Sequence, residues 1–191
     1  MSLYGAKLIG VSGKKGSGKD TVGAYLVENY GFERMAFADP LKEACCQLFG
    51  FDDEQLYGDK KETPDPRWGD VTPRKVLQLV GTELLQTQLN RLIPELGGNI
   101  FSKRLELGLP DLDKYPIVIT DVRFDDEVPI IKRNGGFIIE VVRPSQEREG
   151  DPSLSSHSSE KGLSPKNIDL VIENTGSLSH LYSKIDALFT S

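Results

Sequence analysis

Cysteine is scarce in this chain: only Cys45 and Cys46 occur among 191 residues, and the two are adjacent. Neighbouring cysteines in a predicted helix point in different directions, which argues against a framework disulfide and favours a reducing compartment. Histidine is equally rare, and neither His157 nor His180 is paired with a convincing nucleophile. The sequence therefore gives no support to histidine-based nucleophilic catalysis, and it contains no metal-ligand spacing.

Long apolar runs and an excess of positive charge are also missing. No stretch approaches the about 20 apolar residues of a transmembrane helix, and no secretory signal precedes the first apolar run. Asp and Glu number 29 against 23 Lys and Arg, a net charge of −6, which argues against a nucleic-acid-binding surface. These absences predict a cytoplasmic protein in which residues 1–191 form one domain, with any positive potential gathered around an anionic ligand.

Glycine, by contrast, is well supplied, and segment 13–21 (Gly-Lys-Lys-Gly-Ser-Gly-Lys-Asp-Thr) is the most informative part of the sequence. Two glycines five residues apart, followed by Lys19, form a phosphate-binding loop pattern. An apolar run precedes the loop and a helical pattern follows it, as the mechanism requires. Backbone N–H groups would surround the phosphates, and Lys19 would place its charge at the β- and γ-phosphates. The predicted phosphate ligands are Gly13, Gly16, Ser17, Gly18, Lys19, Asp20 and Thr21.

One position departs from the usual pattern, because Asp20 follows Lys19 where Ser or Thr is expected. The hydroxyl comes one residue later, at Thr21, an arrangement that resembles the nucleoside monophosphate kinases more than the GTPases. The magnesium ligand in the loop therefore stays open between Asp20, Thr21 and a bridging water.

Four further apolar runs follow, at 35–38, 117–120, 137–142 and 170–172. Strands this apolar are buried on both faces, which predicts a parallel sheet of about five strands between helices, the doubly wound α/β fold. Helical patterns lie between and after these runs. They cover 39–49 with Asp39 as N-cap, 72 onward with Val76, Leu77, Val80 and Leu84 on one face, 125–133, and 177 onward.

Three regions exceed what such a sheet requires: residues 52–70, 72–108 and 143–166. We predict a helical acceptor-binding insertion over about 39–108 and a lid over about 143–166. A lid excludes water, which would otherwise compete as the acceptor of a phosphoryl group.

Three side chains follow the apolar run 117–120 and are expected beside the phosphate loop. Asp121 could provide an oxygen ligand to magnesium, directly or through water, or serve as a helix N-cap. Arg123 could hold a phosphate with its planar guanidinium or remain a solvated charge. Glu127 could accept hydrogen bonds from a base or sugar, although acidic residues are also common in the first turn of a helix.

Several Lys and Arg residues lie in the loops expected at the entrance to this site. Each could contact a phosphate group or be a solvated surface charge. Transfer of a phosphoryl group between two anions needs positive charge around it. A phosphate acceptor is already anionic and needs mainly positioning, so no general base is required; Asp39 is the only candidate base. The cations are Lys15, Lys42, Arg67, Arg74 and Arg143.

Taken together, the motifs resemble those of the deoxynucleoside monophosphate kinases of bacteriophages and large DNA viruses. The similar segments run in the same order over nearly the whole chain. They are segment 13–21, Asp-Pro-Leu-Lys at 39–42, Gly-Thr-Glu-Leu at 81–84, Thr-Asp-Val-Arg at 120–123 with Glu127, Val-Val-Arg-Pro at 141–144, His157 through Glu160 to Gly162-Leu163, and Asn-Thr-Gly-Ser-Leu at 174–178.

This resemblance implies ATP-dependent conversion of a dNMP to a dNDP, with magnesium, by a homodimer. Lys19, Arg123 and Lys15 would be catalytic, and Arg143 would belong to the lid over ATP. The turn of Asn174, Thr175 and Gly176 would lie by the adenine. The residues implied around the acceptor nucleotide are Lys15, Leu41, Lys42, Arg67, Arg74, Phe101, Asp121, Arg123 and Glu127.

Two alternatives stay open from the residues. One is a kinase of a hydroxyl-bearing acceptor, similar to dephospho-coenzyme A kinase, with Asp39 as base. The other is a nucleotide-dependent switch without chemistry on a second substrate. The sequence does not specify which bases are accepted.

Overall fold

The computed structural model describes residues 2–144 and 162–190, and the chain divides into two compact units. Unit 1 comprises Met1–Ala36 and Gly108–Ser191, and unit 2 comprises Phe37–Leu107. Most of the predicted lid, including His157 and Glu160, lies outside the described residues. Within the described part of the chain, no helix has the length and apolar character needed to span a membrane.

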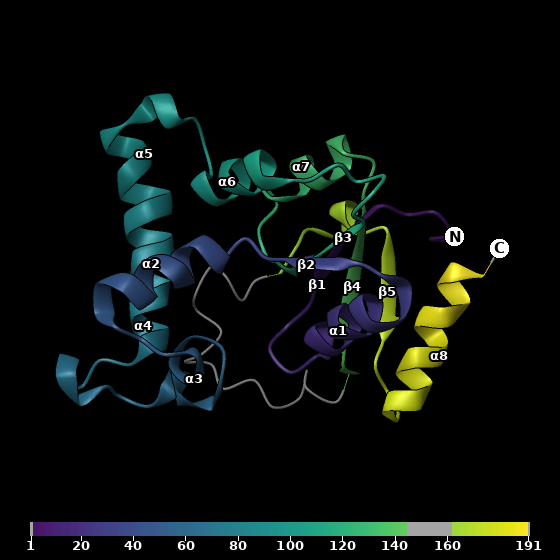
Figure 1. Ribbon diagram of the computed structural model, residues 1–191, viewed down its shortest axis with the longest axis horizontal. Helices are drawn as coiled ribbons and strands as arrows, with labels where there is room; N and C mark the ends of the chain where they lie inside the picture. Colours follow the sequence, from purple (N-terminus) through teal and green to yellow (C-terminus); the bar gives the residue numbers. More distant parts are fainter. Residues whose placement is uncertain (1, 145–161, 191) are drawn as a thin grey trace. The chain divides into compact units, whose positions relative to one another are not determined.

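Unit 1 is built on a five-stranded parallel sheet with the strand order β2-β3-β1-β4-β5 (Figure 1). This confirms the doubly wound α/β fold predicted from the apolar runs. In this order β1 lies between β3 and β4, so the segments that leave β1 and β3 emerge at the same edge of the sheet. The strands are β1 (Leu8–Ser12), β2 (Glu33–Met35), β3 (Ile117–Val122), β4 (Phe137–Val142) and β5 (Leu170–Glu173).

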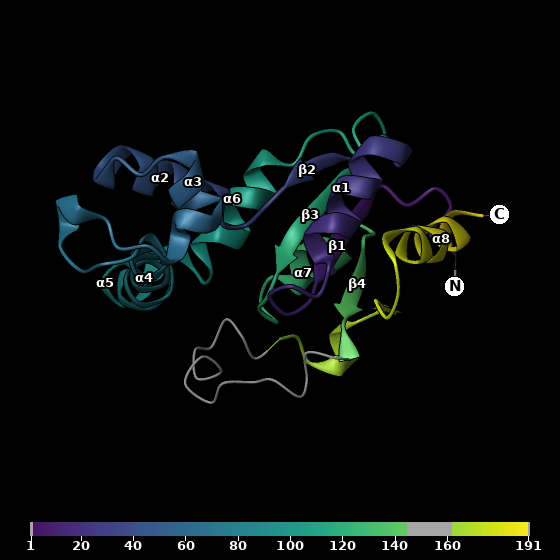
Figure 2. The ribbon, with the colours of Figure 1, turned by 90° about the horizontal axis from the view of Figure 1, so that it is seen from below.

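Alternate residues of β1 face two different helical layers. Ile9 and Val11 join the buried core beneath α1 (Lys19–Tyr30) and α8 (Leu178–Phe189). In Figure 2, α1 is drawn over the strands and α8 lies to their right. On the opposite face, a Cβ on Gly10 would lie 2.7 Å from Ile131 Cδ1 of α7 (Val128–Arg133). Because both faces are covered, the central strands are almost entirely apolar.

Helices α1 and α8 are joined by polar and aromatic contacts. The hydroxyl groups of Tyr25 and Tyr30 donate to Asp186 Oδ1 at 2.9 and 2.7 Å, and Tyr25 stacks on Tyr182 with ring centroids 4.1 Å apart. Burial, with the hydrogen bond to Asp186, raises the pKa of Tyr30 to about 12. These contacts fix α1, and with it the segment that precedes its first turn.

Unit 2 consists of helices and short helical turns. Its buried apolar residues include Leu41, Cys45, Phe51 and Val76. Cys45 and Cys46 are both free thiols. The elements are α2 (Asp39–Phe49), α3 (Asp53–Leu56), η1 (Asp59–Glu62), η2 (Pro66–Trp68), α4 (Pro73–Gln78), the π-helix η3 (Leu79–Gln88), α5 (Leu89–Leu92), η4 (Pro94–Leu96) and α6 (Ile100–Gly108, whose last residue belongs to unit 1).

The structure differs from the sequence prediction at several element boundaries. Helix α7 begins at Val128 instead of residue 125, with Glu127 as its N-cap. The second strand is Glu33–Met35, not 35–38, because its pairing with β3 ends at Met35 although burial continues through Ala36 and Phe37. Helix α2 begins at Asp39, with Ala38 as its N-cap. The chain becomes π-helical after Gln78, which rotates the expected apolar face and leaves Leu84 51% exposed.

Candidate active site

The phosphate-loop pattern lies between β1 and α1, and two of its glycines are sterically required. Gly13 has a φ of 147°, and a Cβ there would lie 2.5 Å from both the Val141 carbonyl oxygen and Ser17 Oγ. Gly18, the N-cap of α1, has a φ of 102°, and a Cβ there would lie 2.5 Å from Asn174 Nδ2. Only glycine fits this backbone, because other residues would be strained and would collide with fixed neighbours.

Lys19 begins helix α1, and only 8% of its surface is exposed. Its Nζ lies 3.2 Å from Oδ2 of Asp20, whose side chain is 81% exposed. The loop therefore combines backbone N–H groups, the positive end of a helix dipole and a nearly buried ammonium group. Such an arrangement is suited to polyphosphate anions. Lys15 and Gly16 lie in the exposed part of the same loop, and Thr21 lies in the first turn of α1.

Asn174 connects the phosphate loop to the end of β5. Its side chain is buried, and its Nδ2 donates to the Ser17 carbonyl at 2.9 Å. The next two residues of the predicted adenine turn, Thr175 and Gly176, are exposed. The structure thus brings Asn174 to the loop itself, a contact between residues far apart in sequence that local patterns could not predict.

The segment that follows β3 leaves the sheet beside the loop. Val122 pairs with Ser12, the residue just before Gly13, so the half-buried Asp121 and Arg123 emerge at the same edge as the phosphate loop. Arg143 directly follows β4, the other neighbour of β1, and is also half-buried. The predicted catalytic edge of unit 1 therefore carries the phosphate loop after β1, which leads to Lys19 at the start of α1, and Asp121 and Arg123 at the end of β3.

Glu127 is a buried acid whose carboxylate shapes the segment that bears Arg123. Its Oε2 accepts hydrogen bonds from the backbone N–H groups of Arg123 at 2.7 Å and Phe124 at 3.0 Å. Burial raises the pKa of Glu127 to about 8; Asp121 and Asp126 add to the rise, and the two N–H donors oppose it. One oxygen of the predicted acceptor ligand is therefore engaged in holding this segment.

Asp125 is a residue that the sequence analysis did not single out. Its carboxylate accepts hydrogen bonds from Ser164 N at 2.9 Å, from Asn167 Nδ2 at 2.7 Å and from Ser164 Oγ. These donors hold the pKa of Asp125 below its usual range. The carboxylate links the β3–α7 segment to the turn η7 (Pro165–Asn167). The only local signal was the acidic run 125–127, which does not reveal such a distant partner.

The remaining predicted acceptor residues lie in unit 2, where they differ in exposure. Leu41 and Phe101 are buried at 7% and 8% exposure, and a Cβ on Gly81 would approach Leu41 Cδ2 to 2.7 Å. The Lys42 ammonium lies 3.9 Å from the centroid of the Tyr57 ring. Arg74 forms an ion pair with Glu62. The structure thus gives the two buried apolar residues packing positions and engages both of these cations.

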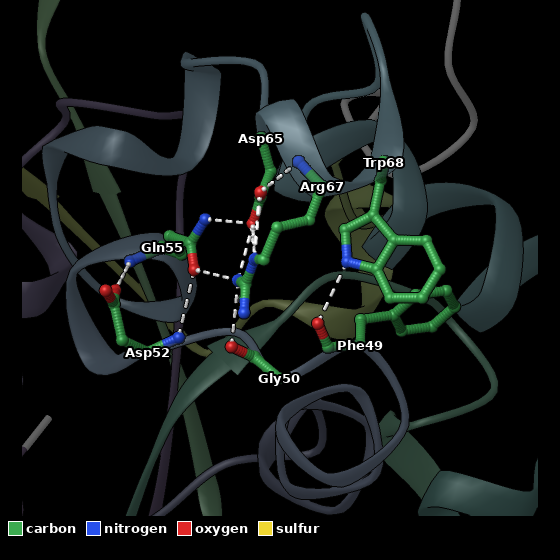
Figure 3. Close-up of polar contacts among 7 residues, drawn as sticks. All are labelled: Phe49, Gly50, Asp52, Gln55, Asp65, Arg67 and Trp68. Atoms are coloured by element: carbon green, nitrogen blue, oxygen red, sulfur yellow. Dashed lines mark hydrogen bonds and ion pairs between the residues drawn. The ribbon is translucent and has the colours of Figure 1, made fainter.

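Arg67 belongs to a polar network at the C-terminal end of α2 (Figure 3). Its Nε and Nη2 donate to the buried carboxylate of Asp65, at 3.0 and 2.6 Å, and Nη2 also donates to the Gly50 carbonyl at 3.0 Å. Gln55 Nε2 donates to Asp65 at 2.8 Å. Nearby, Trp68 Nε1 donates to the Phe49 carbonyl at 2.9 Å. Arg67 and Trp68 thereby satisfy carbonyl groups that a helix end leaves without helical partners.

Replacing Arg67 with alanine should destabilise unit 2 more than replacing Arg74. Arg67→Ala leaves the buried Asp65 carboxylate without its charged partner, whereas Arg74 pairs with a Glu62 side chain that is 52% exposed. Urea unfolding followed by far-UV circular dichroism should show a clearly lower midpoint for Arg67→Ala, with Arg74→Ala close to wild type. Equal midpoints for the two variants would contradict this account.

Comparison with known proteins agrees with this fold and loop. A family model described as deoxynucleotide monophosphate kinase matches residues 7–71 and 66–185. A protein of Acanthamoeba polyphaga mimivirus that bears the same kinase name is 46% identical over 185 residues, 93% of each chain. The deoxynucleotide monophosphate kinase of Enterobacteria phage T4 is 25% identical over 250 aligned positions, covering 94% of this chain and 97% of the phage protein.

Among solved structures, TT1252 from Thermus thermophilus shares the fold, with a TM-score of 0.50, 23% sequence identity and 95% of both chains covered. The family model spans most of the sequence, including the phosphate loop and the segment that carries Asp121, Arg123 and Glu127. The chain belongs to the deoxynucleotide monophosphate kinase family.

Proposed function

We propose that this protein transfers the γ-phosphoryl group of ATP to a deoxynucleoside monophosphate, forming a dNDP and ADP. The observation that carries the proposal is the phosphate loop with the nearly buried Lys19 at the start of α1, in a chain of this family. The acceptor phosphate attacks the γ-phosphorus, the bond to the ADP oxygen breaks, and ADP leaves with that electron pair.

Each residue at the strand edge has a task in this transfer. Loop N–H groups from Gly13 to Gly18 and the ammonium of Lys19 neutralise the donor phosphates. Arg123 stabilises charge on the transferring group, with Lys15 beside it. The family resemblance assigns Lys42, Arg67, Arg74, Leu41 and Phe101 of unit 2 to the acceptor nucleotide, and Arg143 to the lid over ATP.

Magnesium fits the donor set as an ion that binds together with the nucleotide. Mg²⁺ prefers oxygen ligands and takes most of them from phosphates and water, so one or two protein oxygens suffice. Thr21 and Asp121 supply such oxygens, and Asp20 could do so after leaving Lys19. Across residues 2–144 and 162–190, no group of three His, Cys, Asp or Glu side chains could hold a metal by itself. The ion would neutralise charge on the phosphates.

A screen of acceptors tests the proposal directly. We expect ADP release from ATP and Mg²⁺ only after one of the four common dNMPs is added, with weaker responses to the ribonucleotide counterparts. Activity on dephospho-coenzyme A, together with a large loss in Asp39→Asn, would instead support the hydroxyl-acceptor kinase. ADP release without any acceptor, coupled to a change in affinity for a partner, would support the switch.

We propose a homodimer, as the family resemblance implies, and a location in the host cytoplasm, in keeping with the viral and phage relatives. Sedimentation of the purified chain would distinguish a dimer from a monomer.

A further inference from the structure

Asn174 is held in one position by two hydrogen bonds of different origin. Its backbone N–H donates to the Val142 carbonyl at 2.7 Å, which fixes it to the end of β4. Its side-chain Nδ2 donates to the Ser17 carbonyl at 2.9 Å. Both groups are in unit 1, and the residue is 6% exposed. A buried residue whose backbone N–H and side-chain amide each donate to a backbone carbonyl has little freedom to reorient.

The Ser17 carbonyl needs such a partner for a physical reason. A loop that turns its N–H groups toward an anion turns carbonyl groups away from it, and a buried carbonyl must find a donor. The helical ladder of α1 begins one residue later, where Val22 N donates to the Gly18 carbonyl at 3.0 Å. Ser17 precedes that ladder, so the amide of Asn174 supplies the donor that the helix does not.

The contact with Gly18 makes this arrangement specific. A Cβ on Gly18 would lie 2.5 Å from Asn174 Nδ2 and 3.7 Å from Leu181 Cδ2. The asparagine amide therefore lies directly against the backbone of the residue that precedes Lys19. A longer side chain at 174, or any side chain at 18, would push the loop away from β5.

We propose that Asn174 is a positioning residue that holds the phosphate loop in its anion-binding shape by donating to the Ser17 carbonyl. This inference rests on the proposed function, because it assigns the loop to ATP. Asn174 acts on the triphosphate through the loop and does not need to touch the nucleotide. It differs in this from Thr175 and Gly176, which are exposed in the same turn and can face the adenine.

Two variants of Asn174 and one control variant at a neighbouring residue test this role. Asn174→Ala removes the donor, and Asn174→Asp keeps the size but places an oxygen against the Ser17 carbonyl. Glu173→Gln changes an exposed neighbour at the end of β5 and leaves the contact intact. We expect kcat/KM for ATP to fall about tenfold in Asn174→Ala and about a hundredfold in Asn174→Asp. KM for the dNMP should stay within about threefold, and Glu173→Gln should retain the kcat and the KM for ATP of the wild type.

Calorimetry with inorganic tripolyphosphate, which has phosphates but no base, separates positioning from contact with adenine. If Asn174 positions the loop, both Asn174 variants lose affinity for tripolyphosphate in parallel with ATP. If the Asn174 variants bound ATP more weakly but bound tripolyphosphate as the wild type does, the proposal would be overturned, because Asn174 would then contact the adenine base. Circular dichroism must show folded variants; if Asn174→Asp does not fold, Asn174→Ala decides. A wild type that binds tripolyphosphate but phosphorylates no dNMP would refute the proposed function and leave this role standing.

Discussion

Lys19→Met is expected to lower kcat/KM for ATP by about a thousandfold. The rate of ADP release would be measured at varied ATP concentrations, with Mg²⁺ and a saturating dNMP. Lys19 contributes a charge at the first residue of α1, in a place where only 8% of its surface meets solvent. A charge in such surroundings acts on the phosphates more strongly than one in water. Methionine has a similar length and is apolar, so the fold should persist while the charge is lost.

Lys14→Met is the matched control for this prediction. Lys14 lies in the same loop but is exposed, and its loss should change kcat/KM by less than about threefold because solvent screens its charge. Circular dichroism and the melting temperature of Lys19→Met should match those of the wild type. If Lys19→Met kept more than about a tenth of the wild-type kcat/KM, the phosphate loop could not be the catalytic element described above.

Glu127→Gln is expected to remove a large pH dependence of stability. The folded chain raises the pKa of Glu127 from 4.5 to about 8, mainly through burial. Between these values the folded state holds a proton that the unfolded state has released, so stability falls as pH rises from 4.5 to 8. Each pKa unit is worth about 1.4 kcal/mol, which gives a total loss on the order of 5 kcal/mol for this residue.

Glutamine keeps an oxygen that can accept from the N–H groups of Arg123 and Phe124 but carries no charge. Urea unfolding at pH 4.5, 6 and 8 should therefore show similar stability for wild type and Glu127→Gln at pH 4.5, and a growing advantage for the variant above it. Asp126→Asn, at an exposed neighbouring position, should retain most of the wild-type slope. Parallel profiles for wild type and Glu127→Gln would show that Glu127 is ionised in the folded chain.

The parts that the sequence predicted well are those with short-range causes. The phosphate loop is formed by consecutive residues between an apolar run and a helix. In the structure, Gly13 and Gly18 of this loop have positive φ angles. Gly50 and Ser177 end and begin helices as predicted, because capping depends on residues within one turn. The parallel sheet followed from strands that are apolar on both faces.

The parts that the sequence did not predict depend on partners distant in the chain. Nothing near Asn174 indicates that its amide lies 2.9 Å from the Ser17 carbonyl. Asp65 belongs to a charged, irregular segment, yet it is buried because Gln55 and Arg67 donate to it. Glu127 is likewise a typical first-turn acid by sequence, and its pKa depends on burial that only the folded chain creates.

The order in which the chain forms its two units determines which segment can be exchanged without breaking the sheet. Unit 2 is a single continuous stretch, so the backbone leaves the sheet-bearing unit once after Ala36 and returns once at Gly108. In the part of the chain that the structure describes, no strand pairing uses a residue between these points. A chimera that exchanges residues 37–107 for the equivalent stretch of a relative should therefore retain the strand pairings of unit 1 and its phosphate loop.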